Sequence, residues 1–173
     1  VLNIEEETVG QLIEQSIADH AIQDGFTDLG TLEAVVYGPG APEVVSSDTA
    51  IDGDASLVFN FPGENWGGGY LQLETSKDIS AFTALKFSLN KPDSLVNCEI
   101  KLESVASDAV VYLADYTGTE LSDGFVEYTI PLADFSGLDN TELTIPFSIW
   151  NPEGSNGAYV KATVLIDNIY FSM

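Results

Sequence analysis

The chain contains two tryptophans, and the residues around each predict a surface for ring stacking. Trp66 precedes a glycine run at 67–69, and Tyr70 follows it. Successive side chains of a β-strand point to opposite faces. If one strand runs through this stretch, both rings lie on its polar face with Gln72 and Glu74, opposite the face that carries leucines. Stacked rings suit a flat, neutral ligand, and a sugar chain is the ligand we expect.

The second tryptophan repeats the pattern. Apolar residues alternate with polar ones through 143–150, and Trp150 falls on the polar side with Ser148. A polar loop follows at 151–157, which supplies groups that can hydrogen bond to hydroxyls. The predicted ligand-binding residues are Asn65, Trp66, Tyr70, Gln72, Glu74, Trp150, Asn151 and Tyr159. Two alternatives stay open: Trp66 caps an edge of the sheet, or a bulge turns Trp150 back into the core.

The charge of the chain narrows the choice of ligand. It has 28 acidic residues against 5 basic ones, a net charge of −23, and every basic residue is a lysine. Nucleic acid and anionic membranes need a basic patch, so both are excluded as partners. Sulfated or carboxylated polymers are disfavoured because arginine, their preferred clamp, is absent. A neutral ligand, a cation or another protein remains, and the acidity is typical of a secreted or salt-exposed protein.

Residues for catalysis are sparse. His20 is the single histidine and Cys98 the single cysteine, which gives no Ser-His-Asp arrangement and no zinc ligand set. Cys98 alternates with apolar neighbours and is predicted to lie in the core. A pair of carboxylates could cleave glycosides, and Glu74 is the best candidate for one of them. With so many acids, however, any one pairing is uninformative, and we expect a protein without catalytic residues.

A cation is a separate possibility. The loop at 48–54 places Asp48 and Asp52 near Gly53, and oxygen-rich loops of this kind bind calcium. A solvated acidic turn explains the same residues equally well. Asp167 differs because it interrupts an apolar terminal strand, where a buried carboxylate needs a partner or a metal ion.

Short apolar segments separated by turn residues dominate from residue 25 onward. They predict strands over 31–37, 55–61, 84–90, 96–103, 109–114, 125–130, 143–149 and 159–166. With the stretch around Tyr70, about nine or ten strands result, which favours an all-β antiparallel sandwich in a domain spanning 25–173. A bulge is expected near Asp167, where the apolar parity switches. Residues 1–24 are predicted to be an N-terminal extension or linker, with a short helix as one possibility.

Several of these segments resemble a known family. Residues 65–70, 78–87, 127–135, 147–152 and 164–171 are similar to jelly-roll, galactose-binding-like carbohydrate-binding modules, and the resemblance covers 25–173. It implies an antiparallel β-sandwich attached to a secreted glycoside hydrolase. It also implies a structural calcium ion with Asp167 as a ligand; Glu33, Asp48 and Asp52 are weaker candidates. It does not fix which face binds sugar.

The function expected from these observations is non-catalytic binding of a neutral polysaccharide. A β-glucan is the favoured ligand, with a covalently linked catalytic domain as the partner that the module targets. Two alternatives are a docking domain of a larger enzyme, whose aromatic residues pack against a neighbour, and a glycan-cleaving enzyme on the same fold.

Overall fold

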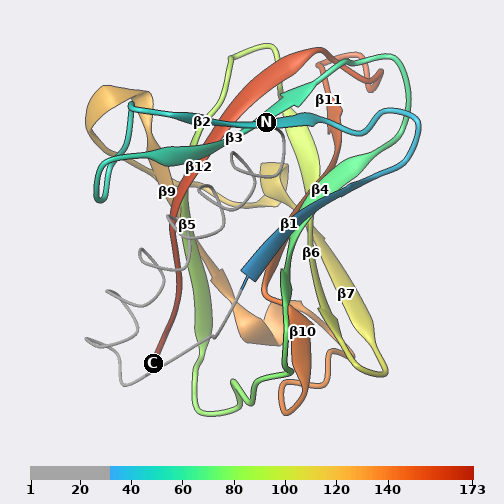
Figure 1. The fold of residues 1–173 in the computed structure, drawn as a ribbon, viewed down its shortest axis with the longest axis vertical. Coiled ribbons are helices and arrows are strands. Elements are labelled where there is room, and N and C mark those ends of the chain that lie inside the picture. Colours follow the sequence, from blue (N-terminus) through green and yellow to red (C-terminus); the bar gives the residue numbers. More distant parts are fainter. Residues whose placement is uncertain (1–31) are drawn as a thin grey trace.

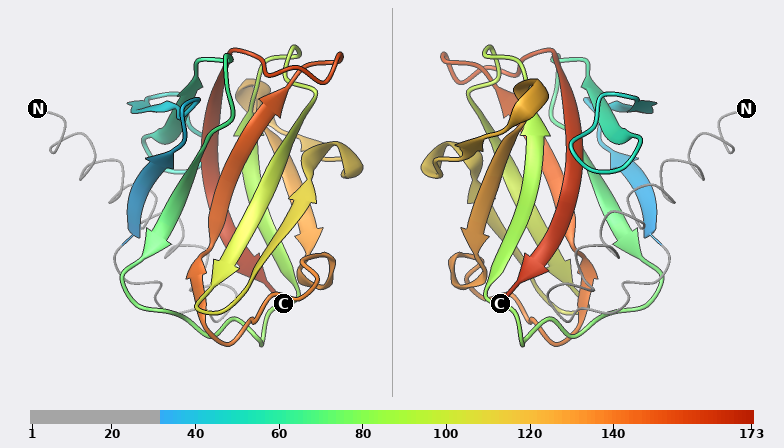
Figure 2. Two further views of the ribbon diagram at one scale, coloured as in Figure 1. Left: turned by 90° about the vertical axis from the view of Figure 1, so that its right-hand side faces the viewer. Right: turned by 90° about the vertical axis from the view of Figure 1, so that its left-hand side faces the viewer.

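The computed structural model describes residues 32–173, which form two antiparallel six-stranded sheets packed face to face (Figures 1 and 2). The predictions for residues 1–24, including His20, lie outside the described residues. Among the described residues there is no α-helix, and hence none long and apolar enough to cross a membrane. The predicted all-β antiparallel sandwich is confirmed.

The first sheet, sheet A, carries most of the candidate site. Its order is β1 (Leu32–Tyr37), β4 (Gly68–Leu73), β11 (Phe147–Glu153), β6 (Asn97–Ser104) and β10 (Leu143–Ile145), and β7 (Asp108–Tyr112) also pairs with β6. Strands far apart in the sequence are therefore neighbours. The left view of Figure 2 looks onto this sheet, with β4, β11, β6 and β7 side by side.

The second sheet, sheet B, forms the other layer. Its order is β2 (Glu43–Ser47), β3 (Ser56–Phe61), β12 (Ala162–Ser172), β5 (Ala84–Asn90), β9 (Val126–Pro131) and β8 (Thr119–Glu120). Short 3-10 turns at Leu113–Asp115, Ser122–Gly124 and Leu132–Asp134 connect strands at the ends of the sandwich.

The core lies between the sheets and is built by simple alternation. In β6 each half-buried residue is followed by a buried one, which places Cys98, Ile100 and Leu102 inside. Five phenylalanines from both layers are fully buried, namely Phe59, Phe87, Phe125, Phe147 and Phe171. Apolar side chains that meet from two inner faces are the main stabilising contribution in such a fold. The polar residues that alternate with these apolar ones along each strand consequently face outward.

Three details differ from the sequence prediction or refine it. The predicted strand at 143–149 is two strands, β10 and β11, separated at Pro146, whose nitrogen cannot donate a ladder hydrogen bond. Strand β2 is additional, because its residues alternate weakly at the sheet edge. The expected terminal bulge is confirmed, since the β12–β5 register shifts between Asp167 and Tyr170 and Asn168 has a φ of 56°.

Candidate functional site

One cross-strand row on the outer face of sheet A collects aromatic residues from distant parts of the chain. Tyr37 pairs with Gly68, which also pairs with Trp150, and Trp150 pairs with Glu99. Glu99 in turn pairs with Tyr112 on β7. Neighbouring strands lie 4.7–4.9 Å apart, so the row extends for about 19 Å across five strands. A short oligosaccharide can lie along such a row.

Trp150 forms the centre of this row. Its indole lies flat over Gly68, where a Cβ atom would overlap two ring carbons. Tyr70 stacks on it at a centroid distance of 6.2 Å and an interplanar angle of 14°. The indole Nε1 donates to Ser148 Oγ at 3.0 Å, and that hydroxyl donates to the Lys101 carbonyl at 2.6 Å. These contacts fix the ring while leaving it half-buried, on the outward face that the sequence predicts.

Trp66 lies beside the row but outside the strand. Strand β4 begins at Gly68, so the predicted strand through the glycines stops short of Trp66. Its ring covers Gly38, whose φ is 96° and where a Cβ would approach Trp66 Cζ3 to 2.7 Å. It also contacts Tyr37 at 5.9 Å, and Tyr37 meets Trp150 at 6.5 Å. Trp66 is 42% exposed, so neither tryptophan belongs to the core.

Together Tyr37, Trp66, Tyr70 and Trp150 form one continuous set of rings, called here the aromatic platform. Burial raises the pKa of the Tyr70 phenol, and Glu103 and Glu33 raise it further, so its hydroxyl stays protonated at neutral pH. The Lys101 Nζ lies 5.9 Å from the Trp150 centroid, and the same ammonium pairs with Glu103 at 3.1 Å and Asp108 at 2.8 Å. The lysine beside the rings is thereby already neutralised.

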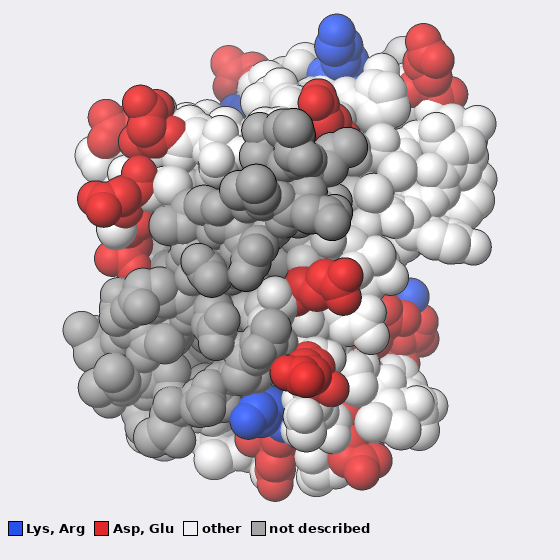
Figure 3. Space-filling view, viewed as in Figure 1, with Lys and Arg blue, Asp and Glu red and all other residues white. Residues whose placement is uncertain are grey.

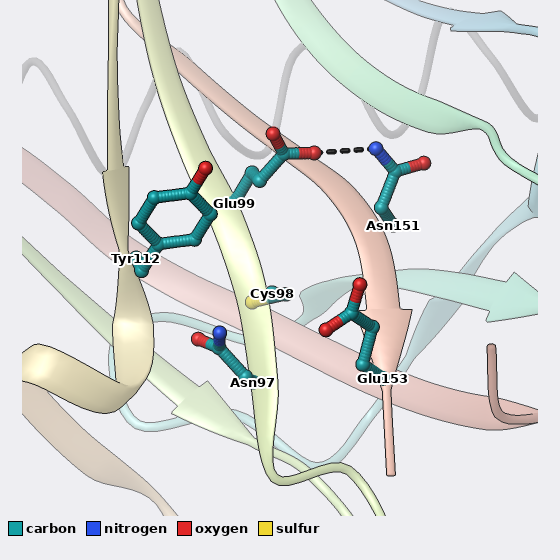
Figure 4. Close-up of a pocket in the computed structure, with 6 residues that line it drawn as sticks. All are labelled: Asn97, Cys98, Glu99, Tyr112, Asn151 and Glu153. Atoms are coloured by element: carbon teal, nitrogen blue, oxygen red, sulfur yellow. Dashed lines mark hydrogen bonds between the residues drawn. The ribbon is translucent and has the colours of Figure 1, made fainter. Parts of the chain in front are cut away.

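Polar groups border the platform where β11 ends. Asn151 has a φ of 53°, a left-handed conformation that asparagine tolerates better than most residues. Its N–H donates to the Gly67 carbonyl at 2.9 Å, its Oδ1 accepts from the Gly67 N–H at 3.0 Å, and its Nδ2 donates to the Glu99 carboxylate (Figure 4). A pocket of about 160 Å³ adjoins these groups. It is lined by Asn97, Cys98, Glu99, Tyr112, Asn151 and Glu153.

The remaining sugar-site candidates lie at varying distances from the platform. Gln72 and Glu74 are exposed and follow Tyr70 at the strand's outward parity. Asn65 is exposed and uses its Oδ1 to accept the Trp66 N–H at 2.9 Å. Tyr159 is 39% exposed and joins Glu153 through an isolated bridge, so it lies at the far end of β11. The structure unites Trp66, Tyr70, Trp150 and Asn151, and it places the other four around them.

Sequence reasoning missed four residues of this face: Tyr37, Glu99, Tyr112 and Glu153. A signal existed for Tyr112, because Val110 and Tyr112 alternate with the apolar Ala109 and Val111. Tyr37 shares its parity with Glu33 on β1 in the same way. No local pattern, however, indicates that β1 and β7 contribute to the same face as Trp150.

The four metal candidates do not converge at one site, although Asp52 lies beside Asp167. Glu33 is exposed on the outer face of sheet A near Tyr70, whereas Asp167 is buried in sheet B. Within residues 32–173 no three His, Cys, Asp or Glu side chains form a group that could hold a metal ion. Asp167 Oδ2 accepts the N–H groups of Ile51 at 2.8 Å and Asp52 at 3.0 Å, and its Oδ1 accepts that of Asn168 at 2.8 Å.

A carboxylate offers about four acceptor sites, so these bonds leave Asp167 one of them. Two oxygens near it in the fold, Ser88 Oγ and Asn168 Oδ1, are buried and have no hydrogen-bond partner among the described residues. Ser88 pairs with Asp167 across β5 and β12. The fit to a cation is therefore confined to Asp167 and its immediate neighbours. Asp48 is exposed in the loop between β2 and β3.

Among the charged side chains on the face shown in Figure 3, acidic ones predominate and lysines are few. The platform is flanked by Glu33, Glu99 and Glu103, with Lys101 paired as described above. A polyanion would meet repulsion along the whole row.

Comparisons with known proteins bear on the fold. No protein-family model and no curated protein matches the sequence. Among similar solved structures is a family 30 carbohydrate-binding module of a cellulosomal cellulase from Clostridium thermocellum. It has a TM-score of 0.59 and 16% identity over 78% of this chain and 83% of that module.

Two further structures show the same likeness. A family 11 carbohydrate-binding module from C. thermocellum, in complex with a β-1,3-1,4-mixed-linked tetrasaccharide, has a TM-score of 0.58 and 12% identity over 82% of this chain and 88% of that one. A β-1,2-glucanase from Parabacteroides distasonis has a TM-score of 0.55 and 16% identity over 82% of this chain but 23% of the enzyme. The strand order, the two packed layers and these likenesses lead to one conclusion: the chain has the jelly-roll β-sandwich fold of carbohydrate-binding modules.

Proposed function

We propose that this protein binds a neutral polysaccharide without cleaving it, and that the chain of sugars lies across the strands of sheet A. The observation that carries the proposal is the row from Tyr37 through Trp150 to Tyr112, in which three aromatic rings are separated by Gly68 and Glu99 on one face of the sheet. The row is long enough for several linked sugar rings, and its central ring is held rigidly by Gly68, Tyr70 and Ser148.

Binding rests on two kinds of contact. The apolar face of a pyranose ring covers the indole of Trp150, which removes hydrocarbon from water on both sides. Hydroxyls at the ring edge then donate to carboxylates and amides such as Glu99 and Gln72. Fixed rings lose little conformational entropy on binding, because the contacts described above already restrict their rotamers.

We favour a β-glucan as the ligand. Two observations support this choice: the long, exposed row, and the similarity in fold to a module whose structure contains a β-1,3-1,4-mixed-linked tetrasaccharide. The absence of arginine from the chain supports an uncharged polymer. The acidic surface is suited to a secreted protein, and we propose that the module directs a covalently attached glycoside hydrolase to its substrate.

The rival function is a docking domain whose aromatic platform packs against a neighbouring protein domain. Calorimetric titration of mixed-linkage β-glucan, cellulose and xylan oligosaccharides separates the two. We expect β-glucan binding that Trp150→Ala weakens by about 5- to 150-fold, since removing a stacking ring costs about 1–3 kcal/mol. Tyr170→Ala, on the outer face of sheet B, is the matched aromatic control and should bind as the wild type does. Absence of binding to every glycan would favour docking.

We also propose a structural calcium ion beside Asp167. What supports it is the buried carboxylate and two buried oxygens, Ser88 Oγ and Asn168 Oδ1, that have no hydrogen-bond partner in the part of the chain that the structure describes. Calcium accepts such mixed carboxylate, amide and hydroxyl ligands and completes its shell with backbone carbonyls or water. Asp167 would supply the carboxylate, and the ion would stabilise sheet B where β12 pairs with β5, without contacting sugar.

A further inference from the structure

The pocket beside the platform exists because of a one-residue bulge in β11. Trp150 pairs with Glu99 and Glu153 pairs with Asn97, so two residues of β11, Asn151 and Pro152, oppose the single residue Cys98 of β6. An extra residue interrupts the ladder and bends the bulged strand. Pro152 has no N–H to restore a bond there. The two strands thus separate locally, and Figure 4 shows side chains of β6, β7 and β11 around the opening.

The charged groups that line this pocket are both carboxylates, which accept hydrogen bonds, and the two asparagines and Tyr112 add amide and hydroxyl groups. The Asn151 side chain accepts from Gly67 with Oδ1 and donates one Nδ2 N–H to Glu99, and Asn97 Oδ1 accepts the Ala114 N–H at 3.0 Å. The other carboxylate oxygen of Glu99 has no hydrogen-bond partner within residues 32–173. The Glu153 carboxylate has no hydrogen-bond or ion-pair partner among residues 32–173, although its backbone carbonyl accepts from Val96.

The charge of the pocket selects against anions. Two carboxylates line it and no lysine does. Lys101, on the neighbouring row, already pairs with Glu103 and Asp108. Carboxylates accept hydrogen bonds only, so an occupant must bring donors of its own. Hydroxyl groups meet that requirement, whereas a uronate or sulfate would be repelled.

The position of the pocket relative to the platform decides which part of a ligand reaches it. Glu99 and Tyr112 belong to the row on which the glycan backbone lies, and Asn97 and Glu153 lie one step farther along the strands. The pocket therefore opens to one side of the glycan backbone and is not a continuation of the row on which that backbone lies. Its volume of about 160 Å³ corresponds to roughly five water molecules at about 30 Å³ each, which is the size of one monosaccharide unit.

We infer that this pocket binds a single neutral glycosyl branch carried by the polysaccharide. The branch hydroxyls donate to Glu99 and Glu153, and the exposed ring of Tyr112 forms the wall next to it. The inference rests on the proposed function, because it assumes that the glucan backbone occupies the platform. It goes further by making the β11 bulge the determinant that distinguishes branched from linear chains.

The test compares three oligosaccharides on one backbone by calorimetry: a linear β-1,4-glucan hexasaccharide, the same chain with one xylosyl branch, and the same chain with one glucuronosyl branch. We expect the xylosyl-branched chain to bind about 10-fold more tightly than the linear one, and the glucuronosyl-branched chain to bind more weakly than both. Glu153→Ala should abolish the preference for the xylosyl branch, and Glu153→Gln, which keeps the shape, should retain part of it. Glu142→Gln changes an exposed acid outside the pocket and should leave all three affinities unchanged.

The outcomes separate this inference from the proposed function. If linear and xylosyl-branched chains bind equally and Trp150→Ala still weakens both, the branch pocket is wrong while glycan binding stands. If no oligosaccharide binds, both are wrong. If an amine-bearing glucosaminyl branch binds more tightly than the neutral one, the pocket recognises a cation, and the neutral assignment is overturned.

Discussion

Two neighbouring glycines of β4 allow the platform to be tested without removing a single aromatic ring. Gly68 faces outward under Trp150, and Gly69 faces the core against Phe59. A Cβ at Gly69 would lie 2.6 Å from two Phe59 ring carbons, and a Cβ at Gly68 would overlap the indole. Neither glycine has a positive φ, so Gly68→Ala and Gly69→Ala each test a steric contact and not backbone strain.

The sizes of the two effects follow from packing distances. Carbon atoms separate by about 3.5–4.0 Å at contact, so each ring must move by about 1 Å or more. Overpacking of this kind costs about 1–3 kcal/mol, which lowers Tm by roughly 2–12 °C in a chain of this size. Moving the indole also disrupts its stack on Tyr70 and its hydrogen bond to Ser148.

We therefore expect both variants to lose stability and only Gly68→Ala to lose glycan affinity. A lost stacking contribution of about 1–3 kcal/mol corresponds to a Kd raised by about 5- to 150-fold. The assay is differential scanning calorimetry for Tm, together with titration of a β-glucan oligosaccharide below the lower Tm. Equal affinities in Gly68→Ala and Gly69→Ala would refute the idea that Trp150, held on Gly68, forms the binding surface.

Two further predictions concern the core and the proposed ion. Burial raises the pKa of the Cys98 thiol from 9.0 to about 12, so the folded protein should resist alkylation at pH 8 and react once it is unfolded in denaturant. Because the pKa is higher in the folded state than in the unfolded state, the contribution of this thiol to stability is complete below pH 9. That contribution is lost as the pH rises toward 12. Rapid labelling of the native protein at pH 8 would contradict the buried position of Cys98. For the proposed calcium ion, we expect a chelator to lower Tm and added calcium to restore it, with glycan affinity unchanged. Asp167→Asn should remove this response of Tm to calcium. An identical Tm with and without chelator would rule the ion out.

Local alternation was enough to predict which way Trp150 faces, whereas Trp66 lies outside β4, so its exposure does not follow from alternation. Although the predicted strand is divided at Pro146, Trp150 still faces outward, because Phe147 and Ile149 of β11 face the core. The composition likewise counted against polyanionic ligands before any fold was considered, since net charge does not depend on topology. The terminal bulge was visible in the sequence as a switch of parity beside Asp167.

Tertiary structure decided which of those outward residues meet. Tyr37 and Tyr112 lie in the same row as Trp150 because β1 pairs with β4 and β7 pairs with β6. Glu33 is separated from Asp167 because their strands belong to different sheets. Alternation has a period of two and specifies a face, but it carries no information about the neighbouring strand. Strand order and register arise from contacts between residues far apart in the chain, and the pocket needs in addition the left-handed backbone of Asn151. The rings could therefore be assigned to a surface from the sequence, while the shape of that surface required the fold.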